Sequence, residues 1–441
     1  MTSAPTASSV RARVAAAASG TGVAAFATLL LFTLFAGDFW RNLISWPAYF
    51  VLAGLLAAGS IVILVRIRPA FHWRRLPGML VLFLLLATVS IAWSAYPGAS
   101  ALGVFAQYAT TAGAVFLALC LDWSQLLRVL SNAFRWILGL SLLFEFIVAA
   151  FVRHPVLPFW AEYPSGKLPA AFYWSRGLLF HGGQIQGIQG NSNLLAMVAL
   201  LAVIVFAIQL ADRTVRRGAG ITWLVIAVLT LGLTRSSTVI VAGLATAVVF
   251  AFAMWMRRVG PDRRRPVYLT AAALVVVVGG LLIAFASRIP ALFGKSEDLT
   301  GRLDIWHAVI GLAQERPAFG WGWVSYWAPW VKPFKGLAER SGVTYLQAHN
   351  AWLDVWLQLG IVGLIVFILL VATTLGRSWF FAVDRPRTTV ADTQPYTALG
   401  LLPLLLIAAL IAQSAAESRI LIEAGWAMLV VLSVKTKQTT P

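Results

Sequence analysis

Two arginines and one histidine are the side chains of this sequence best suited to chemistry on a charged, hydroxylated substrate: Arg235, Arg302 and His349. A guanidinium can bind two oxygens in one plane, which suits a diphosphate better than the point charge of a lysine does. An imidazole near neutral pH can take the proton of a sugar hydroxyl and release it again. Together, these residue types favour transfer of a group from a phosphorylated donor to a hydroxyl.

Each of the three has a simpler alternative. Arg235 sits where two apolar runs are joined with almost no loop, and a guanidinium there can simply snorkel to lipid headgroups. Arg302 opens an amphipathic stretch and can form a surface pair with Asp298 or Asp304, which would contribute little. A lone histidine at the start of a helix, such as His349, is more often a cap or an interface residue.

Several neighbouring residues are candidates for support. Asn350 is expected to cap the helix that follows, and Asp354, about one turn in, to orient the imidazole or to pair with an arginine. Arg176 and the glycine- and amide-rich stretch 182–193 are weaker candidates for contact with a phosphate or a sugar. Four more polar residues near the outer halves of predicted helices have open roles: Glu145, Gln413, Glu417 and Glu423.

The elements that must position these side chains are membrane helices. A content of 60% hydrophobic and 11% charged residues does not suit a soluble surface, and each crossing of a bilayer takes roughly 20 apolar residues. We predict an all-α, polytopic membrane protein with about twelve spans, forming one domain over 22–434. The spans are 22–37, 45–65, 77–93, 101–120, 134–152, 191–211, 219–234, 238–256, 267–286, 351–372, 398–412 and 418–434.

The basic residues predict the orientation of these spans. Most of the 34 lysines and arginines lie in alternate, mostly short connections, which places both termini in the cytoplasm. The net charge of +18 therefore reflects topology and anionic headgroups rather than nucleic acid. The outer connections include two long loops, 153–190 and 287–350, the second of which is expected to form short helices at the membrane surface. All three candidate site residues then face outward.

The ends of the chain and its cysteine add smaller expectations. Residues 1–21 form a tail expected to be disordered, and 435–441 a short cytoplasmic tail. The first apolar run is read as an uncleaved helix rather than a secretory signal, because no cleavage pattern follows it. Cys120 is the only cysteine, so the chain can form no internal disulfide, and no Cys/His metal spacing exists.

Four motifs, taken in order, resemble the O-antigen ligase and polymerase superfamily. They are the Arg235 hairpin, Gly301-Arg-x-x-Ile-Trp306, Glu315-Arg-Pro-x-x-Gly-x-Gly-Trp323 and Ala348-His-Asn-x-x-Leu353. The resemblance implies a metal-independent, inverting glycosyltransferase of the cytoplasmic membrane that uses no cofactor. It implies a donor glycan on undecaprenyl diphosphate at the outer face, held by Arg235 and Arg302, and an acceptor glycan or glycolipid hydroxyl activated by His349.

Two questions remain open at this level. Arg176 followed by Gly187 matches a pattern of polymerase outer loops, but one arginine–glycine spacing is a faint hint, so ligase and polymerase are not separated. A flippase or other transporter of lipid-linked glycan is the main alternative from another class. It predicts charges spread through the midplane of the membrane, whereas the candidate residues here gather at the outer edge.

Overall fold

The computed structural model describes residues 20–161, 163, 168–284, 297–340, 343–385 and 394–439. Over these residues the regular secondary structure is almost entirely helical, which confirms the all-α prediction; the described strands are β1 (Glu339–Arg340) and β2 (Val343–Thr344), an antiparallel pair. The 1–21 tail lies almost wholly outside the described residues. At the other end, α16 runs as a helix through Lys435 to Thr439.

Each of the twelve predicted spans coincides with a helix. They are α2 (Thr21–Phe35), α4 (Trp46–Ile67), α5 (Gly78–Val89), α6 (Pro97–Cys120), α7 (Trp123–Ile147), α8 (Ser192–Ala211), α9 (Arg217–Thr234), α10 (Ser237–Val259), α11 (Arg265–Ala284), α14 (Ala351–Val383), α15 (Leu402–Ser414) and α16 (Glu423–Thr439). Among the described residues, seven helices are long and apolar enough to cross a membrane, namely α4, α6, α7, α8, α9, α10 and α14. The count of twelve crossings stays a prediction.

Some helix boundaries differ from those expected. The helix predicted at 134–152 begins at Trp123, because Asp122 and Gln125 form a capping box that starts it earlier. The first span is followed by a separate short helix, α3 (Gly37–Ile44), bent by 80° from α2. α14 continues to Val383 instead of ending at 372.

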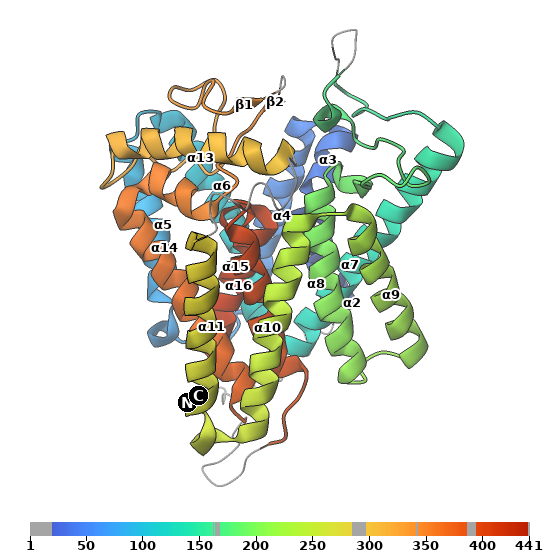
Figure 1. Ribbon diagram of the computed structural model, residues 1–441, viewed down its shortest axis with the longest axis vertical. Helices are drawn as coiled ribbons and strands as arrows, with labels where there is room; N and C mark the ends of the chain where they lie inside the picture. Colours follow the sequence, from blue (N-terminus) through green and yellow to red (C-terminus); the bar gives the residue numbers. More distant parts are fainter. Residues whose placement is uncertain are drawn as a thin grey trace, which may run out of the picture.

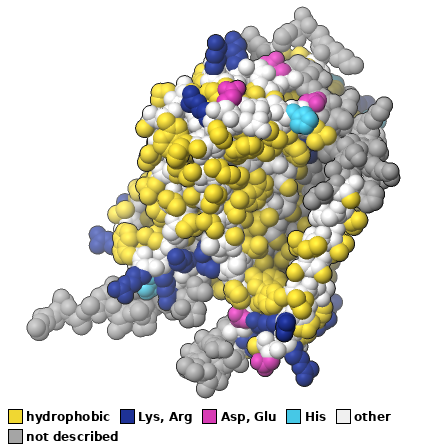
Figure 2. All heavy atoms as spheres, turned by 60° about the vertical axis from the view of Figure 1, so that its left-hand side comes forward, with side chains coloured by type: hydrophobic (Ala, Val, Ile, Leu, Met, Phe, Trp, Pro, Cys, Tyr) yellow, Lys and Arg dark blue, Asp and Glu magenta, His cyan; other side chains and the backbone are white. Residues whose placement is uncertain are grey.

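The surface of the bundle fits an integral membrane protein. Figure 2 shows hydrophobic side chains around the middle of the molecule, with lysine and arginine side chains gathered toward its two ends. Valine and leucine side chains of α11 are largely exposed, Val275 by 71% and Val276 by 73%. Apolar side chains this exposed need lipid rather than water around them.

One end of the bundle, here called the loop end, carries α3, the 153–190 segment, α13 (Glu297–Glu315) and the β1–β2 pair (Figure 1). α13 lies across this end and packs against α14 (Figure 1). Trp306 on α13 donates a 2.9 Å hydrogen bond to the Ala348 carbonyl, which ties the helix to the start of α14. Trp323 and Trp327 are fully buried, so these two do not belong to an interfacial belt.

α14 is broken at Gly360, and the segment 317–322 fills the break. Gly360 has φ +66°, outside helical geometry. Four backbone hydrogen bonds of 2.8–3.2 Å join the two segments: Trp321 to Leu357, Gly322 to Gln358, Ile361 to Pro317 and Val362 to Ala318. The Pro-x-x-Gly-x-Gly motif is therefore a docking segment that fixes α13 above the bundle.

Glu145 has a comparable structural role within the 153–190 segment. Its side chain is 1% exposed on α7, and it accepts hydrogen bonds from the backbone N–H groups of Gln186 and Gly187 at 2.8 and 2.7 Å. It also accepts one from the Ser175 hydroxyl at 2.9 Å. A buried carboxylate with three donors is well satisfied, so Glu145 anchors the loop that carries Arg176.

We expect Gly320→Ala to destabilise the protein, whereas Gly311→Ala should not. Gly320 has φ +69°, and an added Cβ would lie 2.5 Å from the Gln358 carbonyl carbon; nothing lies within 4 Å of a Cβ at Gly311 on α13. The strained backbone and the overlap together should cost about 2 kcal/mol or more. Thermal unfolding in detergent measures the difference, and equal melting temperatures for the two variants would contradict this account of the break.

Candidate functional site

The site is built around the segment that leads into α14. Asn350 caps this helix, its side chain accepting from the N–H groups of Trp352 and Leu353 at 3.0 and 3.2 Å, which confirms the predicted cap. His349, just before the cap, has φ +50°, a left-handed conformation that is uncommon for histidine. Such a conformation persists only where the surroundings hold it.

Asp354 supplies part of that support. Its side chain is 1% exposed and accepts from the Ala348 N–H at 2.9 Å, from the Trp327 indole at 2.8 Å and from the Ser418 hydroxyl. The sequence analysis allowed it to orient the imidazole or to pair with an arginine. Among the described residues it does neither directly, and instead fixes the backbone beside His349.

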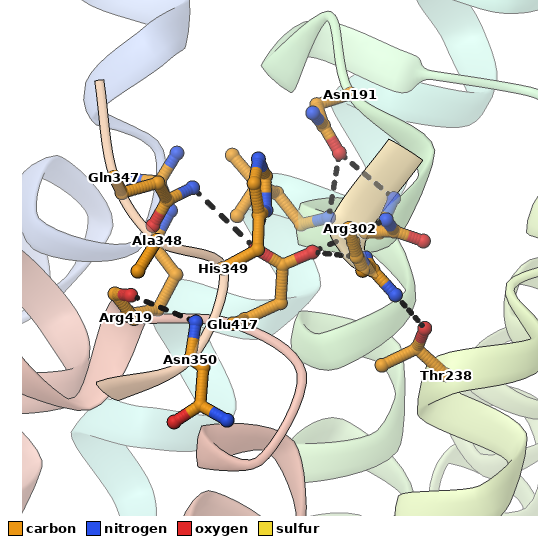
Figure 3. A network of polar contacts seen from close by, with 12 residues as sticks. Asn191, Thr238, Arg302, Gln347, Ala348, His349, Asn350, Glu417 and Arg419 are labelled. Atoms are coloured by element: carbon orange, nitrogen blue, oxygen red, sulfur yellow. Dashed lines mark hydrogen bonds and ion pairs between the residues drawn. The ribbon is translucent and has the colours of Figure 1, made fainter. Parts of the chain in front are cut away.

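The imidazole contacts a different carboxylate. His349 Nδ1 lies 2.9 Å from Glu417 Oε2, and Arg302 Nη2 donates to Glu417 Oε1 at 2.8 Å (Figure 3). The Glu417 side chain is only 5% exposed, against 16% for His349 and 12% for Arg302. One buried carboxylate thus joins two predicted site residues that are 47 positions apart in the sequence.

The surrounding charges keep Glu417 ionised. Burial would raise the pKa of its carboxyl, but the nearby His349, Arg302 and Arg419 outweigh burial and hold the pKa below its ordinary value. An ionised carboxylate only accepts hydrogen bonds, so the hydrogen between the two side chains belongs to His349 Nδ1. In the neutral imidazole this leaves the Nε2 lone pair free to accept a proton.

Neutral polar side chains complete the ring around Glu417. Gln347 Nε2 and Asn193 Nδ2 each lie 3.4 Å from its carboxylate, and Thr238 accepts from Arg302 Nη1 at 3.1 Å (Figure 3). Ser236, the cap of α10, donates to Asn193 at 2.7 Å. Four segments therefore converge here: the start of α8, the start of α10, α13 and the segment before α14.

Arg235 lies beside this network rather than in it. It ends α9 with φ +50°, immediately before Ser236, and its side chain is exposed. Its guanidinium lies close to Gly182, with 3.7 Å from Nη2 to the place of an added Cβ. The close approach of Gly182 supports a role for the 182–193 stretch in shaping this side of the site.

Arg176 contacts the loop that contains it. It donates from Nη2 to the Gln184 carbonyl at 3.4 Å, while its Nε is buried without a partner among the described residues. Gly187, which follows it in the sequence pattern of polymerases, has φ +59°, and an added Cβ would lie 2.6 Å from Ser141. Packing against α7 accounts for that glycine.

A second charged cluster lies next to the site. Arg419 donates to Glu423 at 2.9 Å and to the Tyr326 hydroxyl at 2.6 Å, and Arg41 pairs with Glu423 and, at 3.1 Å, with Asp38. These pairs tie α3 to the start of α16. Glu423, whose role was open, is thus a partner of the buried Arg41 and the half-buried Arg419.

Sequence reasoning singled out the cations of this site but not the groups that connect them. Glu417 stood among the acids of open role, and Thr238, Asn193, Gln347 and Ser418 were not singled out individually. The usable signal for Glu417 was its rarity, since the chain has only 16 acidic residues. Within the described residues, no three His, Cys, Asp or Glu side chains group closely enough to hold a metal ion.

The arrangement pairs an anion-binding guanidinium with a carboxylate-bound imidazole. Arg302 offers forked donors to phosphate oxygens, and His349 offers Nε2 as a base whose charged form Glu417 would stabilise. Such a pair can release a phosphorylated leaving group on one side and take a proton on the other.

The part of the chain that carries most of these residues also matches a known protein family. A family model described as O-antigen ligase matches residues 220–368, from the first turn of α9 to the middle of α14. The match contains Arg235, Arg302, His349 and Asp354, whereas Glu417 and Arg176 lie outside it. A comparison with curated proteins finds no match. The match over residues 220–368 supports the resemblance of this integral membrane protein to the O-antigen ligase and polymerase superfamily.

Proposed function

We propose that the protein transfers a glycan from undecaprenyl diphosphate to a hydroxyl of an acceptor glycan or glycolipid, at the outer face of the cytoplasmic membrane. The observation that carries this proposal is the convergence of Arg302 and His349 on Glu417. The basic bias of the alternate connections supports an orientation with the loop end outside and both termini in the cytoplasm.

In this mechanism Arg302 holds the donor diphosphate, with Arg235 contributing from the adjacent hairpin. His349 Nε2 takes the proton of the acceptor hydroxyl as its oxygen attacks the anomeric carbon. The bond from that carbon to the diphosphate oxygen breaks, and undecaprenyl diphosphate leaves with its charge met by arginine. Attack from the face opposite the leaving group inverts the anomeric centre.

The position of the charges favours transfer over transport. A flippase needs polar groups along the path through the membrane, whereas Arg302 of α13 meets Glu417 and His349 at the loop end. Ligase and polymerase are separated by their products. With a defined lipid-diphosphate oligosaccharide and an acceptor, a polymerase yields a ladder and a ligase yields a single capped species.

We expect Arg302→Ala to lower kcat/KM roughly 30-fold or more, since truncating one partner of a buried, hydrogen-bonded charge pair costs about 2 to 5 kcal/mol. Arg302→Lys should restore only part of this, because an ammonium cannot form the fork. Arg235→Ala should act in the same direction but less strongly, because its side chain is exposed.

The matched control for these arginines is Arg153→Ala, which removes an exposed guanidinium from the 153–190 loop. Transfer of a labelled glycan from the lipid diphosphate provides the measurement. Wild-type turnover in both the Arg302 and the Arg235 variants would contradict the proposed binding of the donor diphosphate by these two arginines.

His349→Ala should reduce turnover about 100-fold or more, the range for a lost general base, with little change in affinity for the donor. The same transfer assay, run at saturating donor, measures it. Full activity in this variant would mean that the base is another group or is unnecessary, with Asp354 the next candidate.

Chelation should leave the reaction unaffected. Because arginine meets the charge of the leaving diphosphate, turnover in excess EDTA is expected to equal turnover without it. A strict requirement for Mg²⁺ or Mn²⁺, restored by adding back the ion, would contradict the arginine mechanism.

A further inference from the structure

The contacts of Glu417 point to a link between donor binding and the base, an inference that rests on the proposed function. Its two oxygens are divided between Arg302 and His349, at 2.8 and 2.9 Å. We propose that the Glu417 carboxylate occupies the diphosphate-binding position on Arg302 until the donor binds. It then interacts with His349 alone, so that the base becomes fully active only with donor bound.

The first step concerns Arg302 without donor. Its side chain is 12% exposed, with one terminal nitrogen on Thr238 and the other on Glu417. A guanidinium buried this far requires an anionic partner, because an unpaired buried charge is strongly destabilising. Glu417 meets that need, and its Oε1 occupies the N–H direction that a phosphate oxygen would use.

The second step is the arrival of a diphosphate. Its oxygens compete with Glu417 for Arg302, and two anions at hydrogen-bonding distance of one cation repel each other. The Glu417 backbone is fixed, since its N–H donates to the Gln413 carbonyl at 2.9 Å and the Ser418 hydroxyl donates to Asp354. The side chain can respond only by rotating toward His349.

The third step is the effect on the imidazole. With its whole charge directed at Nδ1–H, Glu417 stabilises the imidazolium that forms when Nε2 takes the acceptor proton. The other charged groups around Glu417 are Arg419, paired with Glu423, and Asp354, held by Ala348 and Trp327. Both groups already have other hydrogen-bond partners. Glu417 is therefore the charged group here that can exchange one partner for another.

The transfer step then balances. The acceptor oxygen forms its bond to the anomeric carbon, and its proton moves to His349 Nε2. The anomeric carbon–oxygen bond breaks, with the electron pair leaving on undecaprenyl diphosphate. When that product departs, Arg302 is again available to Glu417, and the imidazolium, having lost part of its counter-charge, releases the proton.

The test compares Glu417→Gln with the wild-type full chain in lipid nanodiscs. The probe is undecaprenyl diphosphate, with undecaprenol as the control that lacks the charge. Asp304→Asn is the matched variant, because it removes an exposed carboxylate from α13 close to Arg302. Affinity for the probe and kcat for glycan transfer are measured separately, and kcat is followed against pH.

We expect Glu417→Gln to bind undecaprenyl diphosphate at least as tightly as wild type, because the competing anion is gone, while kcat falls about 100-fold or more. The acid limb of its kcat profile should move to lower pH, since the imidazolium has lost its counter-charge. Asp304→Asn should match wild type in all three measurements. A merely structural role would instead weaken binding and lower kcat together, without moving the limb.

Glu417→Asp keeps the charge but is too short to span both partners, so it should bind the probe normally with a reduced kcat even if the glutamine variant fails to fold. Tenfold weaker binding in a folded Glu417 variant, or a kcat within threefold of wild type, would overturn the inference while leaving the proposed function intact. Failure of the wild-type protein to prefer undecaprenyl diphosphate over undecaprenol would overturn both.

Discussion

The site depends on one interaction, the ionised Glu417 carboxylate enclosed by cationic and amide donors at the loop end. Its partners come from segments that are far apart in the chain: Asn193, Arg302, Gln347 and His349. A carboxylate with 5% exposure is stable only if these donors remain in place. The energy needed to keep that charge buried therefore also fixes the relative positions of α8, α13 and the start of α14.

The same constraint accounts for the rest of this end of the molecule. α13 must hold Arg302 over Glu417, and it is fixed by Trp306 on the Ala348 carbonyl and by the segment 317–322 docked into the broken turn of α14. Asp354 secures the backbone before His349 from below. Each tie uses a backbone group, so the site is supported by rigid elements rather than by loops alone.

Three buried or half-buried glutamates of this apolar chain act as anchors. Glu145 holds the loop at Gln186 and Gly187, Glu423 holds Arg41 and Arg419, and Glu417 holds the site. Of these three, Glu417 is the one that binds Arg302 and His349. A carboxylate that contacts both an anion-binding arginine and a base can couple the binding of an anion at the arginine to the activity of the base.

The apolar runs by themselves determined the helices. In lipid, a chain of this composition must form the hydrogen bonds of its backbone N–H and C=O groups within helices. The arginine and histidine motifs likewise marked Arg302 and His349 as candidate site residues, because both lie in a set of four motifs whose order resembles one family. Other features depended on three dimensions: the early start of α7, the separate α3, and the break at Gly360. Most of all, the role of Glu417 came from tertiary structure, since a single glutamate in a connection has no pattern of its own. Its meaning arises only when folding brings donors from distant segments to one buried charge.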